Sequence, residues 1–224
     1  MKQPVYTLHM TPDSAATILR LALRLTDARF VELPIDRDGG ELDSAAYRVL
    51  QPLGKIPAMQ TPDGPMFETA AMLLYLADRH PGLAPAPDSP QRAAFLKWFF
   101  FTSTNLHPTI LQMFYPERVA GEAHSVIVKT HAVQRLREYL TLLNAMVARD
   151  APDWLSAKPS VFSYYIAVLI RWLAGFGPGT PGYIRSEEYP ALHAVLLGLE
   201  ATPAALAVAE IESLGPTIFT NPAY

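Results

Sequence analysis

Two short segments, around Pro57 and around Glu68, carry the residue types best suited to chemistry. A proline just before an edge strand can hold a cis peptide, which turns the N–H and C=O of Ile56 outward to pair with an extended peptide. Glu68 and Thr69 begin a predicted helix, where free N–H groups and the helix dipole favour a carboxylate. Together these segments predict a site for a small peptide acid. Each also has a structural alternative, because Pro57 can simply end a strand and Thr69 can simply cap a helix.

The elements that must position these residues alternate along the first 80 residues. β-Rich patterns predict strands at residues 4–10, 30–35, 55–60 and 65–67. Apolar residues at helical spacing predict helices at residues 14–25, 44–50 and 70–78. A tight turn joins the last two strands. The order β-α-β-α-β-β-α predicts a mixed sheet covered by helices, an α/β domain over residues 1–80.

The rest of the chain has a different pattern. Residues 81–90 are dense in proline, which favours an extended linker between two domains. Beyond them, helix-period apolar faces predict helices at residues 91–106, 123–149, 160–174 and 191–199. The second domain, residues 91–224, is therefore predicted to be all-α.

Composition narrows the possible functions. Half of the 224 residues are hydrophobic and 17% are charged, which is typical of a compact globular protein. The net charge of −3 provides no basic surface for nucleic acid or for an anionic membrane. No apolar run approaches the roughly 20 residues of a membrane span, and the six histidines have no metal-site spacing, so we expect no membrane and no metal. Cysteine is absent, so sulfur chemistry would have to use the sulfur of a ligand.

Residues 51–78 resemble the glutathione-binding half of cytosolic glutathione transferases, in which a thioredoxin-like domain precedes an α-helical domain. The layout of the whole chain agrees with that family. The resemblance implies that Ile56 pairs with the cysteinyl backbone of glutathione, the co-substrate, and that Pro57 is the family's cis proline.

The same resemblance implies how the two ends of glutathione are held. Glu68 and Thr69 would bind the γ-glutamyl end, although the family usually has serine where Thr69 stands. Lys55 would meet the glycyl carboxylate, with a solvated surface lysine as the alternative.

Family members activate the glutathione thiol with Tyr, Ser or Cys near the end of the first strand. Here His9 and Met10 stand in the region of the tyrosine, and Ala15 stands where bacterial members carry cysteine. Ser14 resembles the serine-type motif of the phi-like and theta-like classes, and we predict that its hydroxyl and the following helix stabilise the thiolate. Thr11 is the reserve donor, and helix capping is the structural alternative for Ser14.

A glutathione transferase also needs an apolar pocket for its electrophile beside the thiol, between the two domains. We assign to that pocket the side chains of Met10, Phe101, His107 and Tyr115. His107 and Tyr115 are the members most able to polarise a substrate. The alternative is core packing, the commoner use of aromatic residues at helical spacing.

Ser160 begins a segment that resembles the family's folding-related N-cap box, with Ser163 where the box normally has aspartate. We expect this weaker cap to cost about 1 kcal/mol of stability.

We therefore predict a cytoplasmic, homodimeric glutathione transferase that conjugates glutathione to a small apolar electrophile, a detoxification reaction. One alternative is a glutathione-dependent disulfide reductase or peroxidase. Another is a non-catalytic glutathione-binding or protein-interaction module.

Overall fold

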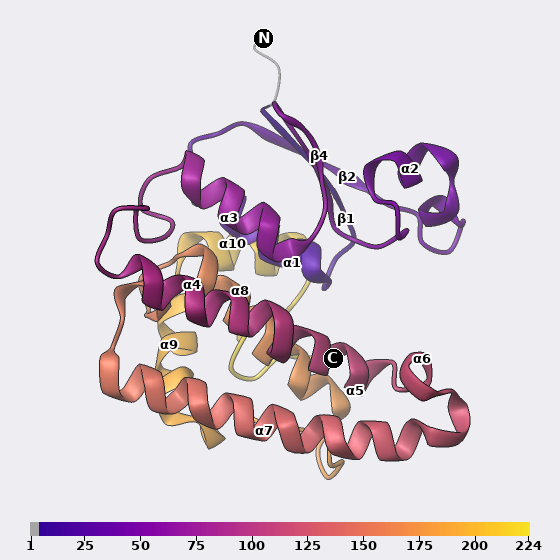
Figure 1. Ribbon diagram of the computed structural model, residues 1–224, viewed down its shortest axis with the longest axis vertical. Helices are drawn as coiled ribbons and strands as arrows, with labels where there is room; N and C mark the ends of the chain where they lie inside the picture. Colours follow the sequence, from indigo (N-terminus) through magenta and orange to yellow (C-terminus); the bar gives the residue numbers. More distant parts are fainter. Residues whose placement is uncertain (1–4) are drawn as a thin grey trace.

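The computed structural model describes residues 5–224 (Figure 1); Pro4, the first residue of the first predicted strand, lies outside this range. The four strands are β1 (Tyr6–Met10), β2 (Phe30–Pro34), β3 (Ala58–Thr61) and β4 (Gly64–Met66). They form one sheet in the order β2-β1-β3-β4. β1 pairs parallel with β2 and antiparallel with β3, and β3 pairs antiparallel with β4. The predicted mixed sheet is confirmed.

Three helices accompany the sheet: α1 (Ala15–Leu23), α2 (Ala45–Leu50) and α3 (Thr69–Arg79). α1 and α3 lie between the strands and the C-terminal helices, whereas α2 lies on the other side of the strands in Figure 1. Residues 16–23 of α1 are all buried, because this helix contacts β1, α3, α8 and α10. The sheet, its helices and the all-α second half constitute the predicted thioredoxin-like and helical fold.

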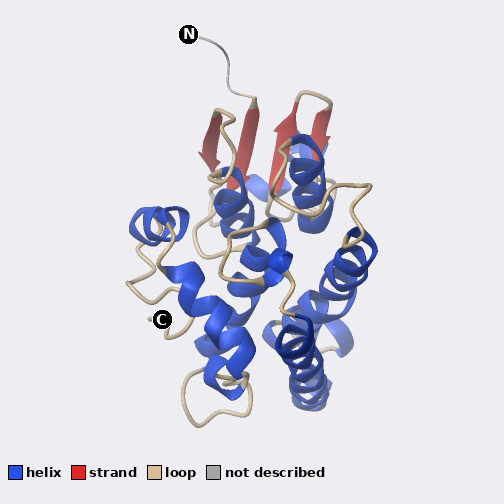
Figure 2. Ribbon diagram, turned by 90° about the vertical axis from the view of Figure 1, so that its left-hand side faces the viewer, coloured by secondary structure: helices blue, strands red, loops and turns tan. Residues whose placement is uncertain are grey.

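The C-terminal half is helical throughout, and its helices gather on one side of the sheet (Figure 2). The helices are α4 (Arg92–Phe101), α5 (His107–Phe114), α6 (Glu117–Ala120), α7 (Ser125–Asp150), α8 (Val161–Leu173), α9 (Pro190–Glu200) and α10 (Pro203–Ile211). A π-helical turn, η2 (Thr102–Leu106), joins α4 to α5. Short 3-10 turns are η1 (Glu41–Asp43), η3 (Glu122–His124), η4 (Asp153–Leu155), η5 (Ala174–Phe176) and η6 (Ser186–Glu188).

Besides the four-residue helix α6, two helices were not predicted from the sequence. Residues 91–106 were expected to form a separate helix, but the chain continues through η2 into α5. Pro108 lies in the first turn of α5, directly after this π-helical turn. The other helix is α10, which begins after Thr202, whose hydroxyl accepts a hydrogen bond from the N–H of Ala205 at 3.4 Å.

The central helix α8 is buried along all of its 13 residues. Its N-terminus has the predicted capping box. The Ser160 hydroxyl accepts from the N–H of Ser163 at 2.9 Å, and the Ser163 hydroxyl accepts from the N–H of Ser160 at 2.8 Å. Serine therefore fills the position of the usual aspartate with both reciprocal bonds formed.

No single helix within residues 5–224 is long and apolar enough to cross a membrane. α9 and α10 reach the required length and apolar character only when they are taken together, and a bend of 77° separates them.

Candidate functional site

The loop between β1 and α1 lies at the centre of the candidate site. Ile35 donates its N–H to the carbonyl of Met10 at 2.9 Å, which brings the segment after β2 to one side of the loop. On the other side, His9 of β1 is the register partner of Ala58, the first residue of β3. Thr11 therefore lies between the segment that follows β2 and the segment that precedes β3.

The peptide bond between Ile56 and Pro57 is cis, as predicted. Among the described residues, neither the N–H nor the C=O of Ile56 forms a hydrogen bond with another backbone group. Both groups are therefore open to an added peptide strand. Lys55 has an exposed side chain, and its carbonyl accepts a hydrogen bond from the Tyr47 hydroxyl at 2.7 Å, which fixes the backbone before Ile56.

The N-terminus of α3 approaches the requirements of an anion site. No side chain caps its first turn. Glu68, the N-cap residue, has φ +70°, a conformation that costs a non-glycine residue about 1–3 kcal/mol. The first N–H groups of α3 have no intrahelical partner, and Thr69 is the first residue of the helix. This arrangement favours a bound carboxylate.

Ser14 caps α1. Its hydroxyl oxygen accepts a hydrogen bond from the N–H of Ala16 at 3.1 Å, and its proton is donated to the carbonyl of Thr11 at 2.7 Å. The Thr17 hydroxyl accepts from the N–H of Ser14 at 3.2 Å and completes a capping box. The structural alternative for Ser14 is therefore realised, and its single O–H would have to leave the Thr11 carbonyl before it could donate to a sulfur atom.

Thr11 presents the opposite situation. Its side chain is buried, with 9% of the residue exposed, and its hydroxyl has no hydrogen-bond partner within residues 5–224. Buried hydroxyls are nearly always bonded, so this one calls for an explanation. Thr11 lines a cavity of about 510 Å³ together with residues of the segment after β2. The reserve donor of the sequence analysis is thus the hydroxyl that remains free to donate.

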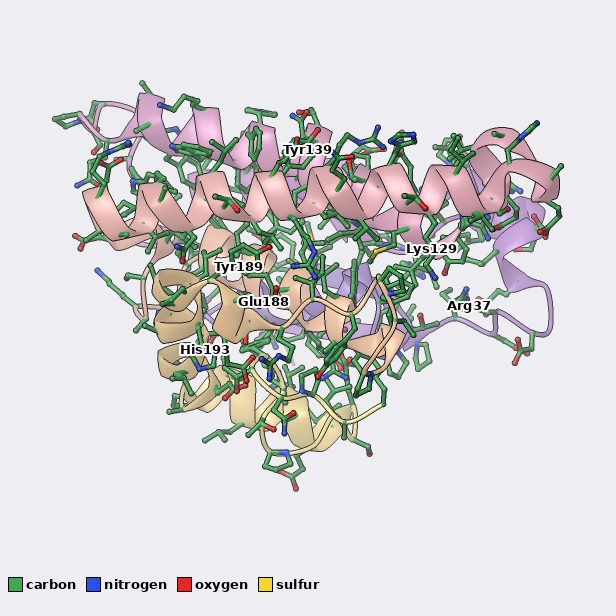
Figure 3. The ribbon with its side chains drawn as sticks, turned by 90° about the horizontal axis from the view of Figure 1, so that it is seen from below. Arg37, Lys129, Tyr139, Glu188, Tyr189 and His193 are labelled. Carbon is green, nitrogen blue, oxygen red and sulfur yellow. The ribbon has the colours of Figure 1, made fainter. Side chains whose placement is uncertain are left out.

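Arg37 lines the same cavity and was not predicted as a site residue. It is exposed on the loop after β2 (Figure 3). The sequence there indicates only a loop, because a single arginine before Asp38 and two glycines has no pattern that assigns it to a ligand. Arg37 is thus a cation of the cavity that Thr11 lines, where Asp36 and Asp38 contribute two carboxylates.

The four residues predicted for an electrophile pocket have different surroundings. Met10 is 2% exposed, and its sulfur accepts a hydrogen bond from Arg20 at 3.4 Å, so it belongs to the core. The Phe101 ring packs edge-on against that of Tyr139 in α7, with 5.3 Å between the ring centres. The guanidinium of Arg118 lies over the Tyr115 ring, 3.9 Å from the ring centre. A cavity of about 580 Å³ between α5 and α7 is lined by none of the four predicted residues.

His107 is the predicted pocket residue with a polar partner from another helix. Its Nδ1 lies 2.8 Å from the hydroxyl of Tyr165 in α8, and its ring lies 5.7 Å from that of Trp172. Burial lowers the pKa of His107 to about 4. Burial, reinforced by the carboxylate of Glu68, raises the pKa of Tyr165. Both groups are therefore neutral at pH 7.

The buried indole N–H of Trp172 has no partner in the described part of the chain. Within residues 5–224, no group of three or more His, Asp or Glu side chains is arranged to hold a metal ion.

A four-stranded mixed sheet with a cis proline before β3, followed by an all-helical half, defines a thioredoxin-like protein of the glutathione transferase type. Residues 3–78 match the family described as "Glutathione S-transferase, N-terminal domain". The GST-like protein YncG of Escherichia coli is 29% identical over 75% of this chain and 80% of its own length. The disulfide-bond oxidoreductase YfcG of the same organism is 28% identical over 72% of this chain and 74% of its own.

Solved structures extend the similarity to both halves of the chain. A sphingomonad glutathione S-transferase complexed with glutathione superposes with a TM-score of 0.73 and 26% identity, over 93% of this chain and 100% of that one. Residues 3–78 therefore match a glutathione S-transferase N-terminal domain, and both halves of the chain are similar to glutathione S-transferases in sequence and fold.

Proposed function

We propose that this protein binds glutathione along Ile56 and Thr69 and stabilises its thiolate beside the β1–α1 loop. The glutathione sulfur then forms a bond to an electrophilic carbon of a second substrate. The observation that carries the proposal is the unpartnered, buried Thr11 hydroxyl beside the segment of the cis proline, in a chain that is similar to glutathione S-transferases in sequence and fold. A solved relative of similar fold contains glutathione.

The binding groups suit the parts of this tripeptide. The free N–H and C=O of Ile56 match the cysteinyl backbone as an added strand. The first turn of α3, with Thr69, suits the γ-glutamyl carboxylate, and the cationic Lys55 and Arg37 suit the glycyl carboxylate.

We infer that Thr11 donates the hydrogen bond that holds the sulfur as thiolate, while Ser14 fixes the loop by capping α1. A free thiol has a pKa of about 8.5 and is mostly protonated at pH 7. One hydrogen bond to a charged acceptor contributes about 1.5–3 kcal/mol, which corresponds to about 1–2 pKa units. The thiol proton leaves to solvent, the sulfur lone pair forms the new C–S bond, and the leaving group departs with its bonding electrons.

On the electrophile side, we propose that His107 and Tyr165 form a neutral hydrogen-bonding pair. The two side chains share one hydrogen bond, which leaves one N–H or O–H of the pair available to a substrate. The buried Trp172 indole adds another unpartnered donor nearby. These donors favour an electrophile whose activating group carries a hydrogen-bond acceptor, such as a carbonyl or nitro oxygen.

The test is a pH titration of the thiolate absorbance of bound glutathione, with binding measured by calorimetry. Thr11→Val should raise the thiol pKa by about 1–2 units and keep glutathione bound. Ser14→Ala should cost about 1 kcal/mol of stability through the lost cap and shift the thiol pKa less. If Ser14→Ala alone restores an ordinary thiol pKa, Ser14 is the donor. An ordinary pKa in the unaltered protein would refute thiolate stabilisation.

A second candidate activity is reduction of disulfides by two glutathione molecules. It is favoured by the similarity to the disulfide-bond oxidoreductase YfcG and by the absence of cysteine, which requires both thiols to come from glutathione. An assay with a mixed disulfide would release oxidised glutathione, whereas the conjugation reaction would not. Homodimer formation and a cytoplasmic location remain expectations of the family resemblance, and sedimentation would test the former.

A further inference from the structure

The β1–α1 loop is held by two buried ionic side chains from the C-terminal half. The first is Arg171 of α8, which is 1% exposed, while Asp13 of the loop is 27% exposed. Arg171 donates to both carboxylate oxygens of Asp13 at 2.9 Å, from Nε and Nη2. Asp13 has φ +46°, so this bidentate pair fixes a loop residue in a left-handed conformation.

The remaining contacts of Arg171 hold it in place. Its Nη1 donates to the carbonyl of Ile218 at 3.0 Å. Its guanidinium lies 4.8 Å from the centre of the Tyr224 ring, and the hydroxyl of Tyr224 donates to the carbonyl of Arg171 at 2.9 Å. The last residues of the chain therefore support the cation that holds Asp13.

The second ionic side chain is Glu212, which follows α10 and whose side chain is 0% exposed. Its Oε2 accepts from the N–H of Asp13 at 2.7 Å and from the hydroxyl of Thr17 at 2.8 Å. Its Oε1 accepts from Arg20 of α1 at 2.6 Å, and Arg20 also bonds Glu32 at 2.7 and 2.9 Å. The buried carboxylate of Glu212 is thus balanced by the buried cation of Arg20. It also accepts hydrogen bonds from the loop, at Asp13, and from α1, at Thr17.

These contacts reach the candidate thiolate donor through three linked residues. Asp13 is held at its carboxylate and at its N–H, and it precedes Ser14, whose hydroxyl donates to the carbonyl of Thr11. Buried ion pairs contribute little net stability because desolvation offsets their attraction, but they can select one geometry. The structural alternative is that the pairs only fasten the two halves of the chain together.

We propose that Arg171 and Glu212 are positioning residues that hold the Thr11–Ser14 loop so that the Thr11 hydroxyl faces the sulfur of glutathione. This inference rests on the proposed function. Neither residue touches the reacting atoms, and both act through Asp13.

Three variants test the inference. Asp13→Asn keeps the size of the side chain and a residue type that tolerates positive φ, but it removes the charge from the pair. Arg171→Lys keeps the charge but removes the fork that bonds both oxygens. Tyr164→Phe is the control, because it deletes a buried hydrogen bond of the same helix, to Thr202 at 2.8 Å, that does not reach the loop.

Hydrogen exchange of the amides of residues 13–16 should rise by about tenfold or more in Asp13→Asn and Arg171→Lys, and stay unchanged in Tyr164→Phe. The same two variants should raise the pKa of the bound glutathione thiol, and the control should not. If Arg171→Lys does not fold, Asp13→Asn provides the test. We expect this variant to fold because Asp13 is 27% exposed, so water can solvate the groups that lose the ion pair.

Normal loop exchange and a normal thiol pKa in a folded Asp13→Asn variant would refute the inference. Failure of the unaltered protein to lower the thiol pKa would instead refute the proposed function. Loop exchange would still show whether the ion pairs hold the loop.

Discussion

Lowering the pH from 7 to 4.5 should destabilise this protein through His107. Burial lowers the pKa of His107 to about 4, whereas an unfolded chain has a histidine pKa of about 6.5. Between these values the unfolded state binds one more proton than the folded state, so stability falls as the pH falls. The contribution is fully present above pH 6.5. At pH 4.5 it should be reduced by about 2 kcal/mol.

The assay is urea unfolding at pH 7 and at pH 4.5, with the unaltered protein and with His107→Gln. Glutamine can keep a hydrogen bond with the Tyr165 hydroxyl but cannot take up a proton. The difference in unfolding free energy between the two proteins should therefore change by about 2 kcal/mol between the two pH values. His124→Gln, at an exposed position, is the control. An unchanged difference would mean that His107 is not held neutral by burial, and the neutral donor pair proposed for the electrophile would lose its basis.

Two further substitutions separate the core from the ligand site. Met10→Ala should cost about 2–5 kcal/mol of unfolding free energy and leave electrophile selectivity unchanged, because this side chain is buried in the core; altered selectivity at unchanged stability would contradict that placement. Arg37→Gln should weaken glutathione binding by about 1 kcal/mol at low salt and by less at high salt, since the exposed cation acts through a screened attraction. Calorimetry at two salt concentrations measures this, and an unchanged affinity at low salt would exclude Arg37 from the site.

The strand and helix order of the sheet could be predicted because it is encoded locally. Periodicity predicts the strands and helices. The segments around Pro57 and Glu68 predict the cis peptide and the uncapped start of α3. The position of Met10 could not be derived in the same way. Both His9 and Met10 are buried, since β1 is covered on both of its faces, and alternation along a strand does not then separate core residues from pocket residues.

The identity of the thiolate donor also depends on more than sequence spacing. Ser14 and Thr11 both carry hydroxyls at suitable positions, and only the loop geometry shows that the Ser14 proton is already bonded. The anchors of the loop are even less accessible to sequence reasoning, because Arg171 and Glu212 lie 158 and 199 positions from Asp13 and meet it only in the folded chain. A local pattern can indicate candidate groups, but the fold decides which of them remains free to act.

The substitution Thr11→Val tests whether the unpartnered Thr11 hydroxyl serves the ligand or the core. The two roles predict different combinations of effects on the unliganded protein and on the thiolate-bound state. A buried hydroxyl without a partner costs about 1–3 kcal/mol in the unliganded protein, so Thr11→Val, of similar shape, should leave the unliganded protein equally stable or more stable. The same change removes the hydrogen bond proposed for the thiolate, so it should weaken the thiolate-bound state. A residue that serves only packing would shift both states in the same direction. If Thr11→Val keeps or raises thermal stability without glutathione but weakens the bound thiolate, Thr11 serves ligand binding. If both stability and thiolate binding change in the same direction, Thr11 serves the core.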